Sequence, residues 1–241
     1  MEVLQDIVGY NNRKIYHDDK YFSFGLDSLS LAYFTKIYPK DKKIIDLGSG
    51  NGIIPLILSL FTDTVIDAVE IQEELCNLFK KSIDYNKINN IKVYNVDMKK
   101  FVNSNNRCCY DIVTCNPPYF ENTSRVSINN YKAIARSEVC ITLEEIIFIS
   151  NQLLKDKGRL YIVYRVDRFD ELVFFLLKYK YGIKKVRYIY NKVDESSKLV
   201  LVEAIKNRKC DFFVDKPLII LDNNGEKTEE YKNILGGNYY E

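Results

Sequence analysis

Four consecutive residues, Asn-Pro-Pro-Tyr at positions 116–119, constrain the fold more than any other stretch of this sequence. They follow an apolar run at 111–115 that is typical of a strand buried inside a parallel sheet. Two successive prolines cannot continue a ladder of backbone hydrogen bonds, so the strand must end here. Because ligands bind at the carboxyl ends of strands in open α/β sheets, we expect a site at this position. An ordinary proline-rich turn with a surface tyrosine is the simpler alternative.

The functional interpretation rests on three groups of this motif. Asn116 offers a side-chain oxygen and Pro117 a backbone carbonyl, and both accept hydrogen bonds from N–H groups. The ring of Tyr119 can stack on a planar partner. This combination favours the recognition of a planar amino group.

The composition is that of a globular protein, because 46% of the 241 residues are hydrophobic and 28% are charged. This length suffices for one α/β domain with a small extension. No apolar run is long enough for a membrane span, and the first residues lack the basic and apolar segments of a signal peptide. We therefore expect a cytoplasmic protein with no membrane partner.

Cysteine and histidine usage limits the chemistry. The six cysteines form no Cys-x-x-Cys pair, and His17 is the single histidine, so we expect reduced thiols and no metal. Nucleophilic hydrolysis by a Ser-His-Asp or Cys-His arrangement would need that same histidine, which is far from any nucleophile motif. The net charge is only +2, so a nucleic-acid partner would require a local basic patch.

Strand-like and helix-like segments alternate from residue 43 onward. Strands are expected over 43–47, 65–69, 91–95, 111–115, 160–164, 183–190 and 198–205, with a possible further strand at 217–221. Helices are expected over 53–61, up to about 85, from a Thr142–Glu145 capping box to 158, and over 169–179. Three strand–helix units before residue 111 imply a parallel, doubly wound sheet, and the strands at 183–190 and 198–205 are expected to be antiparallel.

The residues before this core are expected to form a hairpin and a helix. Strands at 14–17 and 21–24 would flank a polar turn, and Asp27 would cap a helix that runs to about Tyr38. We expect residues 1–40 to pack on a core at 41–241 that includes a short C-terminal extension, giving a single domain overall.

The turn after the first core strand is rich in glycine, and Gly48, Gly50 and Gly52 open directly into a helix. Glycines permit a tight turn and a close approach to a ligand at which helix N–H groups point. Glu70 ends the second strand about 20 residues after Gly48, where a carboxylate can accept both hydroxyls of a ribose. Asp97 ends the third strand and can accept from an adenine amino group. Alternatively, both acids are merely solvated strand ends.

With Asp46 and the motif at 116–119, these residues resemble the class I S-adenosylmethionine-dependent methyltransferases over residues 44–165. The resemblance implies a Rossmann-like α/β fold with a seven-stranded, mostly parallel sheet, an antiparallel last strand and helices on both faces. It implies S-adenosyl-L-methionine as cofactor, with the ribose at Glu70, the methionine moiety at the glycine loop, and the adenine at Asp97 and the Met98 backbone. The implied cofactor-binding residues are Asp46, Gly48, Ser49, Gly50, Gly52, Glu70, Ile71, Asp97, Met98 and Asn116.

The resemblance assigns catalysis to Asn116, Pro117 and Tyr119. An exocyclic amino group is a poor nucleophile because its lone pair is delocalised into the ring. Two hydrogen-bond acceptors draw the nitrogen towards tetrahedral geometry and stabilise the positive charge that grows on it. The sulfonium is already activated, so the reaction needs positioning and no general base. Cys115 is expected to lie in the core.

Several methyl acceptors suit this motif: adenine N6 in DNA or RNA, guanine N2 in RNA, and the glutamine amide of a protein. DNA enzymes of this kind carry a large recognition domain, for which 241 residues leave no room. The glutamine enzymes carry a sizeable helical N-terminal domain, whereas only 43 residues precede Ile44. RNA is therefore favoured, while guanine-N2 methylation, glutamine-N5 methylation and an inactive RNA-binding module stay open as alternatives.

Short flanking segments make the resemblance more specific. Residues 22–28, 135–138 and 217–231 resemble the bacterial tRNA(Val) adenine-N6 methyltransferases, which modify the purine beside the anticodon. The resemblance implies a tRNA substrate, with adenine 37 of tRNA(Val) as the target. We expect a monomer with no obligate protein partner.

Two basic stretches are candidates for contact with RNA. Residues 178–192 combine six Lys or Arg with four Tyr and no acid, which suits phosphate neutralisation and base stacking. Alternatively, strands with one buried face and one solvent-exposed face would show the same alternation of Tyr and Lys. The stretch 120–140 has no periodicity and directly leaves the active-site strand. We expect Arg125, Lys132 and Arg136 in this stretch to bind the substrate.

Overall fold

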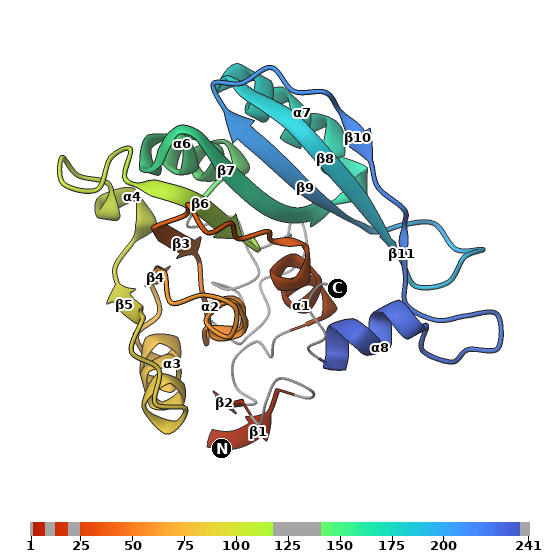
Figure 1. Cartoon of the computed structure of the whole chain (residues 1–241), viewed down its shortest axis with the longest axis horizontal. Helices are drawn as coiled ribbons and strands as arrows, with labels where there is room; N and C mark the ends of the chain where they lie inside the picture. The colour runs from red at the N-terminus through yellow and green to blue at the C-terminus, as the bar shows by residue number, and fades with distance from the viewer. Residues whose placement is uncertain (1, 8–12, 19–24, 118–140, 237–241) are drawn as a thin grey trace, which may run out of the picture.

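A nine-stranded sheet forms the centre of the computed structural model (Figure 1), which describes residues 2–7, 13–18, 25–117 and 141–236. Its strands are β3 (Lys43–Leu47), β4 (Val65–Glu70), β5 (Ile91–Asn95), β6 (Tyr110–Cys115), β7 (Leu154–Arg165), β8 (Tyr181–Tyr190), β9 (Leu199–Lys206), β10 (Phe213–Val214) and β11 (Leu218–Ile219). The order across the sheet is β10-β8-β9-β7-β6-β3-β4-β5, and β11 also pairs with β8.

The directions of the seven long strands agree with the prediction. β3 is parallel to β4 and β6, β4 is parallel to β5, and β6 is parallel to β7. β9, the last long strand, is antiparallel to both of its neighbours, β7 and β8. The two-residue strands β10 and β11 extend the sheet at β8. β11 lies within the possible strand at 217–221, whereas β10 was not predicted.

Helices cover both faces of the sheet, as Figure 1 shows for α1 and α2 on one side and α6 and α7 on the other. The helices are α1 (Leu26–Phe34), α2 (Ile53–Leu58), α3 (Glu73–Tyr85), α4 (Met98–Phe101), α6 (Leu143–Leu153), α7 (Phe169–Lys178) and α8 (Glu229–Gly236), with a 3-10 turn at Val166–Arg168. Successive strand residues point to opposite faces, so Ile44 and Ile112 join one core cluster while Ile45 and Val113 join the other. Both faces of the sheet are therefore buried, which explains the nearly continuous apolar strands.

The N-terminal hairpin differs from the predicted one. β2 (Lys14–Asp18) pairs antiparallel with β1 (Glu2–Asp6), which was not predicted as a strand. Residues 21–24, the expected partner, lie outside the described residues. β1 is mostly exposed, so its short sequence carries no burial pattern, and its pairing with β2 determines its conformation.

This hairpin packs on α3 through polar contacts. The Tyr16 amide donates to the Ser82 hydroxyl at 2.9 Å, and the Lys14 amide and carbonyl both bind the side chain of Asn86, at 3.0 and 2.7 Å. The side-chain amide of Asn51, in the glycine loop, also donates to the Tyr16 carbonyl, at 3.4 Å. The hairpin is thereby tied both to α3 and to the loop that follows β3.

Several element boundaries also differ from the prediction. Helix α1 starts after Gly25, and Asp27 lies inside its first turn, where its carboxylate accepts from the Ser28 amide at 2.8 Å, so Asp27 is not the cap. The helix ends at Phe34, before the predicted end at about Tyr38. The Thr142–Glu145 capping box is present, but α6 ends at Leu153 and β7 begins at once, so the predicted helical end at 158 is wrong. Helix α8 was not predicted, because its sequence is mostly polar.

Candidate active site

The predicted site residues converge because the parallel strands end at the same level. Leu47 of β3 lies opposite both Val69 of β4 and Cys115 of β6. Glu70, at the end of β4, lies opposite Asn95 of β5. The residues that immediately follow these positions therefore form one row along the carboxyl edge of the sheet.

The glycine loop between β3 and α2 is tightly bound to the next strand. The amides of Gly48 and Ser49 both donate to the Val69 carbonyl, at 2.9 and 3.0 Å. Gly52 has a φ of +90°, and a Cβ atom there would lie 2.2 Å from the Phe79 ring. Gly50 has a φ of +56° and would meet no atom within 4 Å. Gly52 thus serves the packing of α2 on α3, whereas Gly50 faces open space at the sheet edge.

Glu70 holds the loop from the opposite side. One carboxylate oxygen accepts from the Gly50 amide and the other from the Gln72 amide, both at 2.8 Å. The side chain is almost fully buried, and burial raises the pKa of Glu70, with these two backbone hydrogen bonds opposing the shift. Each oxygen has a second lone pair, so the carboxylate can still accept a pair of hydroxyl groups.

Asp46 lies beneath the loop and is only 1% exposed. Its Oδ1 accepts from the Thr114 hydroxyl on β6 at 2.6 Å. Its Oδ2 is buried and has no hydrogen-bond partner among the described residues. Burial raises the pKa of Asp46 to about 7, with the Thr114 hydrogen bond opposing the shift. An unpaired buried carboxylate oxygen is costly, and a cationic amino group placed nearby would satisfy it.

The far side of the row offers an apolar surface and a fixed acid. Ile71 is 47% exposed directly after β4. Asp97 follows β5 and caps α4, where its Oδ1 accepts from the Lys99 amide at 2.8 Å. The Met98 methyl group would lie 3.7 Å from a Cβ atom at Gly48. These residues leave an exposed apolar side chain beside the glycine loop, as a flat aromatic ring would require.

Asn116 follows β6 in the same row. Its amide nitrogen donates to the hydroxyl of Ser28, in the first turn of α1, at 2.8 Å. Ser28 is itself buried, and its backbone amide is bound by Asp27. Pro117 is buried too, while Cys115 lies in the core, as expected, and burial raises the pKa of its thiol far above the ordinary range. The asparagine is thus oriented by helix α1.

The described structure adds two residues that were not singled out from the sequence, Ser28 and Thr114. Thr114 is a polar residue inside an otherwise apolar strand, which is a signal that could have been used. Ser28 lies within residues 22–28, which were noted only because they resemble the tRNA(Val) adenine-N6 methyltransferases. Tyr119, Arg125, Lys132 and Arg136 lie outside the described residues, so their predicted roles stay predictions.

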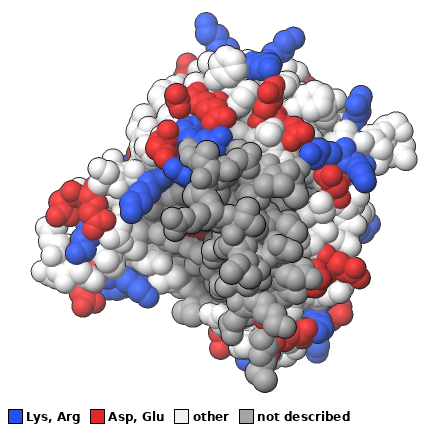
Figure 2. All heavy atoms as spheres, turned by 180° about the vertical axis from the view of Figure 1, so that it is seen from behind, with Lys and Arg blue, Asp and Glu red and all other residues white. Residues whose placement is uncertain are grey.

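Three of the six basic residues in the stretch at 178–192 are paired with acids. Lys178, Lys185 and Arg187 form ion pairs with Glu144, Asp215 and Glu230, at 2.6, 3.2 and 2.6 Å. The four tyrosines of this stretch are buried or half-buried, not exposed for stacking. On the face in Figure 2, acidic and basic side chains are likewise interspersed. Alternation along β8 therefore mainly reflects ion pairing and core packing, because both of its faces are covered.

Comparison with solved structures confirms the fold class. A predicted O-methyltransferase from Agrobacterium tumefaciens superposes with a TM-score of 0.70 at 18% identity, covering 90% of this chain and 98% of that chain. M. jannaschii TYW2 in complex with AdoMet superposes with a TM-score of 0.57 at 15% identity, covering 85% of each chain. The architecture is that of a Rossmann-like, class I methyltransferase.

The family follows from the sequence match. The family model of the methyltransferase small domain matches residues 14–171, and the chain belongs to this family. The predicted enzyme class and its cofactor, S-adenosyl-L-methionine, are thereby confirmed.

Curated relatives share one name. The tRNA1(Val) (adenine(37)-N6)-methyltransferase of Flavobacterium psychrophilum is 25% identical over 228 residues, which cover 93% of this chain and 95% of the relative. The protein of that name from Photorhabdus laumondii is 31% identical over 61% of this chain and 60% of its own length. Two others, from Parabacteroides distasonis and Trichodesmium erythraeum, are matched over 66% and 54% of their lengths. The family resemblance predicted from the flanks is confirmed.

Across the described parts of the chain, no helix is long and apolar enough to cross a membrane.

Proposed function

We propose that this protein transfers a methyl group from S-adenosyl-L-methionine to the N6 amino group of an adenine in tRNA, with adenine 37 of tRNA(Val) as the target. The observation that carries the proposal is the position of Asn116. It stands at the carboxyl edge of β6, fixed by Ser28, in the same row as Glu70 and the glycine loop. The names of the relatives support the choice of adenine N6 and of tRNA.

The residues at this edge fit the cofactor. Glu70 would accept the two ribose hydroxyls, and Asp46, through its unpaired Oδ2, would attract the cationic amino group of the methionine moiety. The backbone of the loop at 48–52 would lie along that moiety, with Gly50 facing open space. Ile71 would cover one face of the adenine, and Asp97 with Met98 would contact its edge. When bound, the cofactor supplies a methyl group that its sulfonium has already activated.

The chain itself positions the acceptor nitrogen. The Asn116 side-chain oxygen and the Pro117 carbonyl would each accept one N–H of the adenine amino group. These two hydrogen bonds localise the nitrogen lone pair and stabilise the positive charge that develops as the new N–C bond forms. The proton then released from nitrogen passes to water, since the reaction requires orientation and no strong base. Because the Asn116 amide already donates to Ser28, its oxygen is turned away from that serine.

Further parts of the proposal concern the rest of the chain. Tyr119 would stack on the flipped adenine, and Arg125, Lys132 and Arg136 would bind the RNA beside it. We propose that the N-terminal hairpin and α1 form one unit with the core, and that the enzyme acts as a monomer in the cytoplasm.

A direct experiment tests the proposal. Unmodified tRNA is incubated with the protein and labelled S-adenosyl-L-methionine, and the nucleosides are then identified by mass spectrometry. N6-methyladenosine at position 37 of tRNA(Val) is the expected product. N2-methylguanosine would identify the alternative RNA enzyme, and label found only on a glutamine of added protein would identify the protein enzyme. An absence of any transfer would indicate an inactive RNA-binding module.

A further inference from the structure

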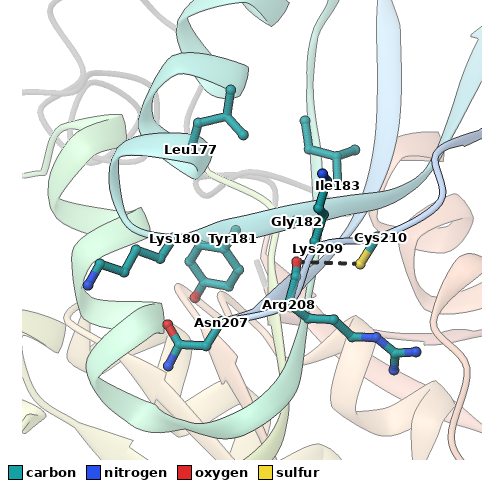
Figure 3. Close-up of a pocket in the computed structure, with 9 residues that line it drawn as sticks. All are labelled: Leu177, Lys180, Tyr181, Gly182, Ile183, Asn207, Arg208, Lys209 and Cys210. Atoms are coloured by element: carbon teal, nitrogen blue, oxygen red, sulfur yellow. Dashed lines mark hydrogen bonds between the residues drawn. The ribbon is translucent and has the colours of Figure 1, made fainter.

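A basic pocket lies at the end of the sheet opposite to the active site. It has a volume of about 530 Å³ and is lined by residues of α7, β8 and the segment that follows β9 (Figure 3). Three of its nine lining residues, Lys180, Arg208 and Lys209, are cationic, and none is acidic. Leu177 and Ile183 form its apolar side. Lys184 lies next to this pocket on β8, with its ammonium 4.4 Å from the centre of the Phe213 ring.

These cations differ from the other basic residues around β8. Lys178, Lys185 and Arg187 each have a carboxylate partner within 4 Å. In the described part of the chain, no such ion pair is formed by Lys180, Lys184, Arg208 or Lys209, which together we call the amino-edge cluster. The positive charge of this cluster is therefore not neutralised by internal ion pairs.

The backbone that carries the cluster is rigidly placed. The Asn207 amide donates to the Lys180 carbonyl at 2.8 Å, and both residues have positive φ angles, of +53° and +60°. A Cβ atom at Gly182 would lie 1.8 Å from the Arg208 carbonyl oxygen, so the two segments are in direct contact there. The Cys210 thiol donates to that same carbonyl at 3.7 Å. The cations thus project from a fixed turn, which lowers the entropic cost of binding.

Strand register places the cluster far from the methyl-transfer site. The active-site edge follows Cys115, which pairs with Ile162 of β7, and Ile162 pairs with Val202 of β9. The cluster begins where β9 ends, because Lys206 pairs with Tyr181 at the start of β8. Along β9, the chain advances from Val202 to Lys206 at about 3.3 Å per residue, and three strand spacings of about 4.8 Å separate β6 from β8. The methyl-transfer site and the cluster are therefore about 20 Å apart. A ligand that reaches both must span this distance.

We propose that the amino-edge cluster binds the phosphate backbone of the tRNA substrate beyond the anticodon stem-loop that carries the methylated base. Unpaired Lys and Arg side chains on a fixed backbone suit a polyanion, and the exposed Phe213 offers a surface for a base or ribose. This inference rests on the proposed function, since it takes tRNA as the substrate. It assigns the enzyme a second contact with a folded RNA, in addition to the contacts that surround the target base.

The test compares two double variants with the same change of charge. Arg208→Ala/Lys209→Ala removes two cations of the cluster, and Lys80→Ala/Lys92→Ala removes two exposed cations near the opposite edge strand, β5. Binding of an unmodified tRNA(Val) transcript and of its isolated anticodon stem-loop is measured across a range of salt concentrations. For the cluster variant, the Kd of the full transcript should rise about tenfold, and the slope of log K against log salt should fall by about 1.5 to 2.

Three further results are expected. The anticodon stem-loop should bind the cluster variant and the unaltered protein equally, the control variant should bind the full transcript normally, and kcat at saturating tRNA should be unchanged. Lys184→Ala should show the same effect to a smaller degree, which provides a second variant if the first is unstable. Unchanged binding of the full transcript, or an equal loss with the control, would overturn the inference. An equal loss with the stem-loop would overturn the remote position. Methyl transfer by the unaltered protein tests the proposed function separately.

Discussion

Asn116 and Ser28 are joined by a 2.8 Å hydrogen bond that connects the end of β6 to the first turn of α1. The residues are far apart in sequence, yet one orients the other. The side-chain amide of asparagine has a nitrogen that donates hydrogen bonds and an oxygen that accepts them. Because the nitrogen of Asn116 donates to Ser28, its oxygen faces another direction. Ser28 is therefore a positioning residue for the proposed reaction, and its effect can be separated from that of Asn116.

Replacing Asn116 by Ala is expected to lower kcat by a factor of about 10² to 10³, because an acceptor used mainly in the transition state is lost. Ser28→Ala should lower kcat by about tenfold with little change in the Kd of the cofactor. Ser28→Thr, which keeps the hydroxyl, should largely restore the rate. In the double variant Asn116→Ala/Ser28→Ala, the serine change should have no further effect. Additive losses in single-turnover assays would show that Ser28 acts through some route other than Asn116.

Glu70→Ala is expected to raise the Kd of S-adenosyl-L-methionine by about 10- to 100-fold, because a charged acceptor of two hydrogen bonds is removed. The loss also leaves the amides of Gly50 and Gln72 without their partner, so the loop should become less ordered. Calorimetric titration of the cofactor measures the effect. Glu73→Ala, an exposed change of equal charge in the first turn of α3, serves as the control and should leave the affinity within about twofold. Equal affinities for the Glu70 variant and the control would contradict the assignment.

The glycine loop gives a pair of matched substitutions. Gly52→Ala places a methyl group 2.2 Å from the Phe79 ring in addition to the strain of a positive φ, so the free energy of unfolding should fall by at least about 3 kcal/mol. Gly50→Ala meets only the backbone strain and should cost about 1 to 2 kcal/mol. Urea denaturation measures both values. If the two substitutions destabilise equally, the close contact between the loop and α3 is not as described.

The sequence predicted the core better than its edges, for physical reasons. β3, β4 and β6 are mostly apolar runs bounded by glycine, acids or proline, so their position and direction follow from local pattern. β1 and α8 are mostly exposed and polar, and only their tertiary contacts order them. The end of α6 was misplaced because Gly158 was taken as a helix terminus, whereas it lies inside β7 against Leu154.

Within the site, residues at the ends of successive strands could be predicted, since parallel strands bring their carboxyl ends together. Ser28 could not, because its contact with Asn116 depends on how α1 crosses the sheet edge. The charges of β8 were misjudged for a similar reason. Its acidic partners Asp215 and Glu230 are separated from Lys185 and Arg187 in sequence and meet them only in the fold.

Asp46 should make the stability of the free protein depend on pH. Burial raises the pKa of Asp46 from an ordinary 3.8 to about 7, so between these values the native state retains a proton that the unfolded chain has released. The native state therefore loses stability as pH rises through this window, by up to about 4 kcal/mol if Asp46 titrates alone, because each unit of pKa corresponds to about 1.4 kcal/mol. Above about pH 7 this contribution should become constant.

Asp46→Asn isolates this effect, because the asparagine oxygen can still accept from Thr114 while the side chain carries no charge. Denaturant unfolding at pH 5 and at pH 8 should show a smaller loss of stability for the variant than for the unaltered protein. At pH 8 the variant should also bind the cofactor more weakly, since the amino group of the methionine moiety loses its anionic partner. A variant whose stability keeps the full pH dependence would show that another group, with Glu70 as the first candidate, retains the proton.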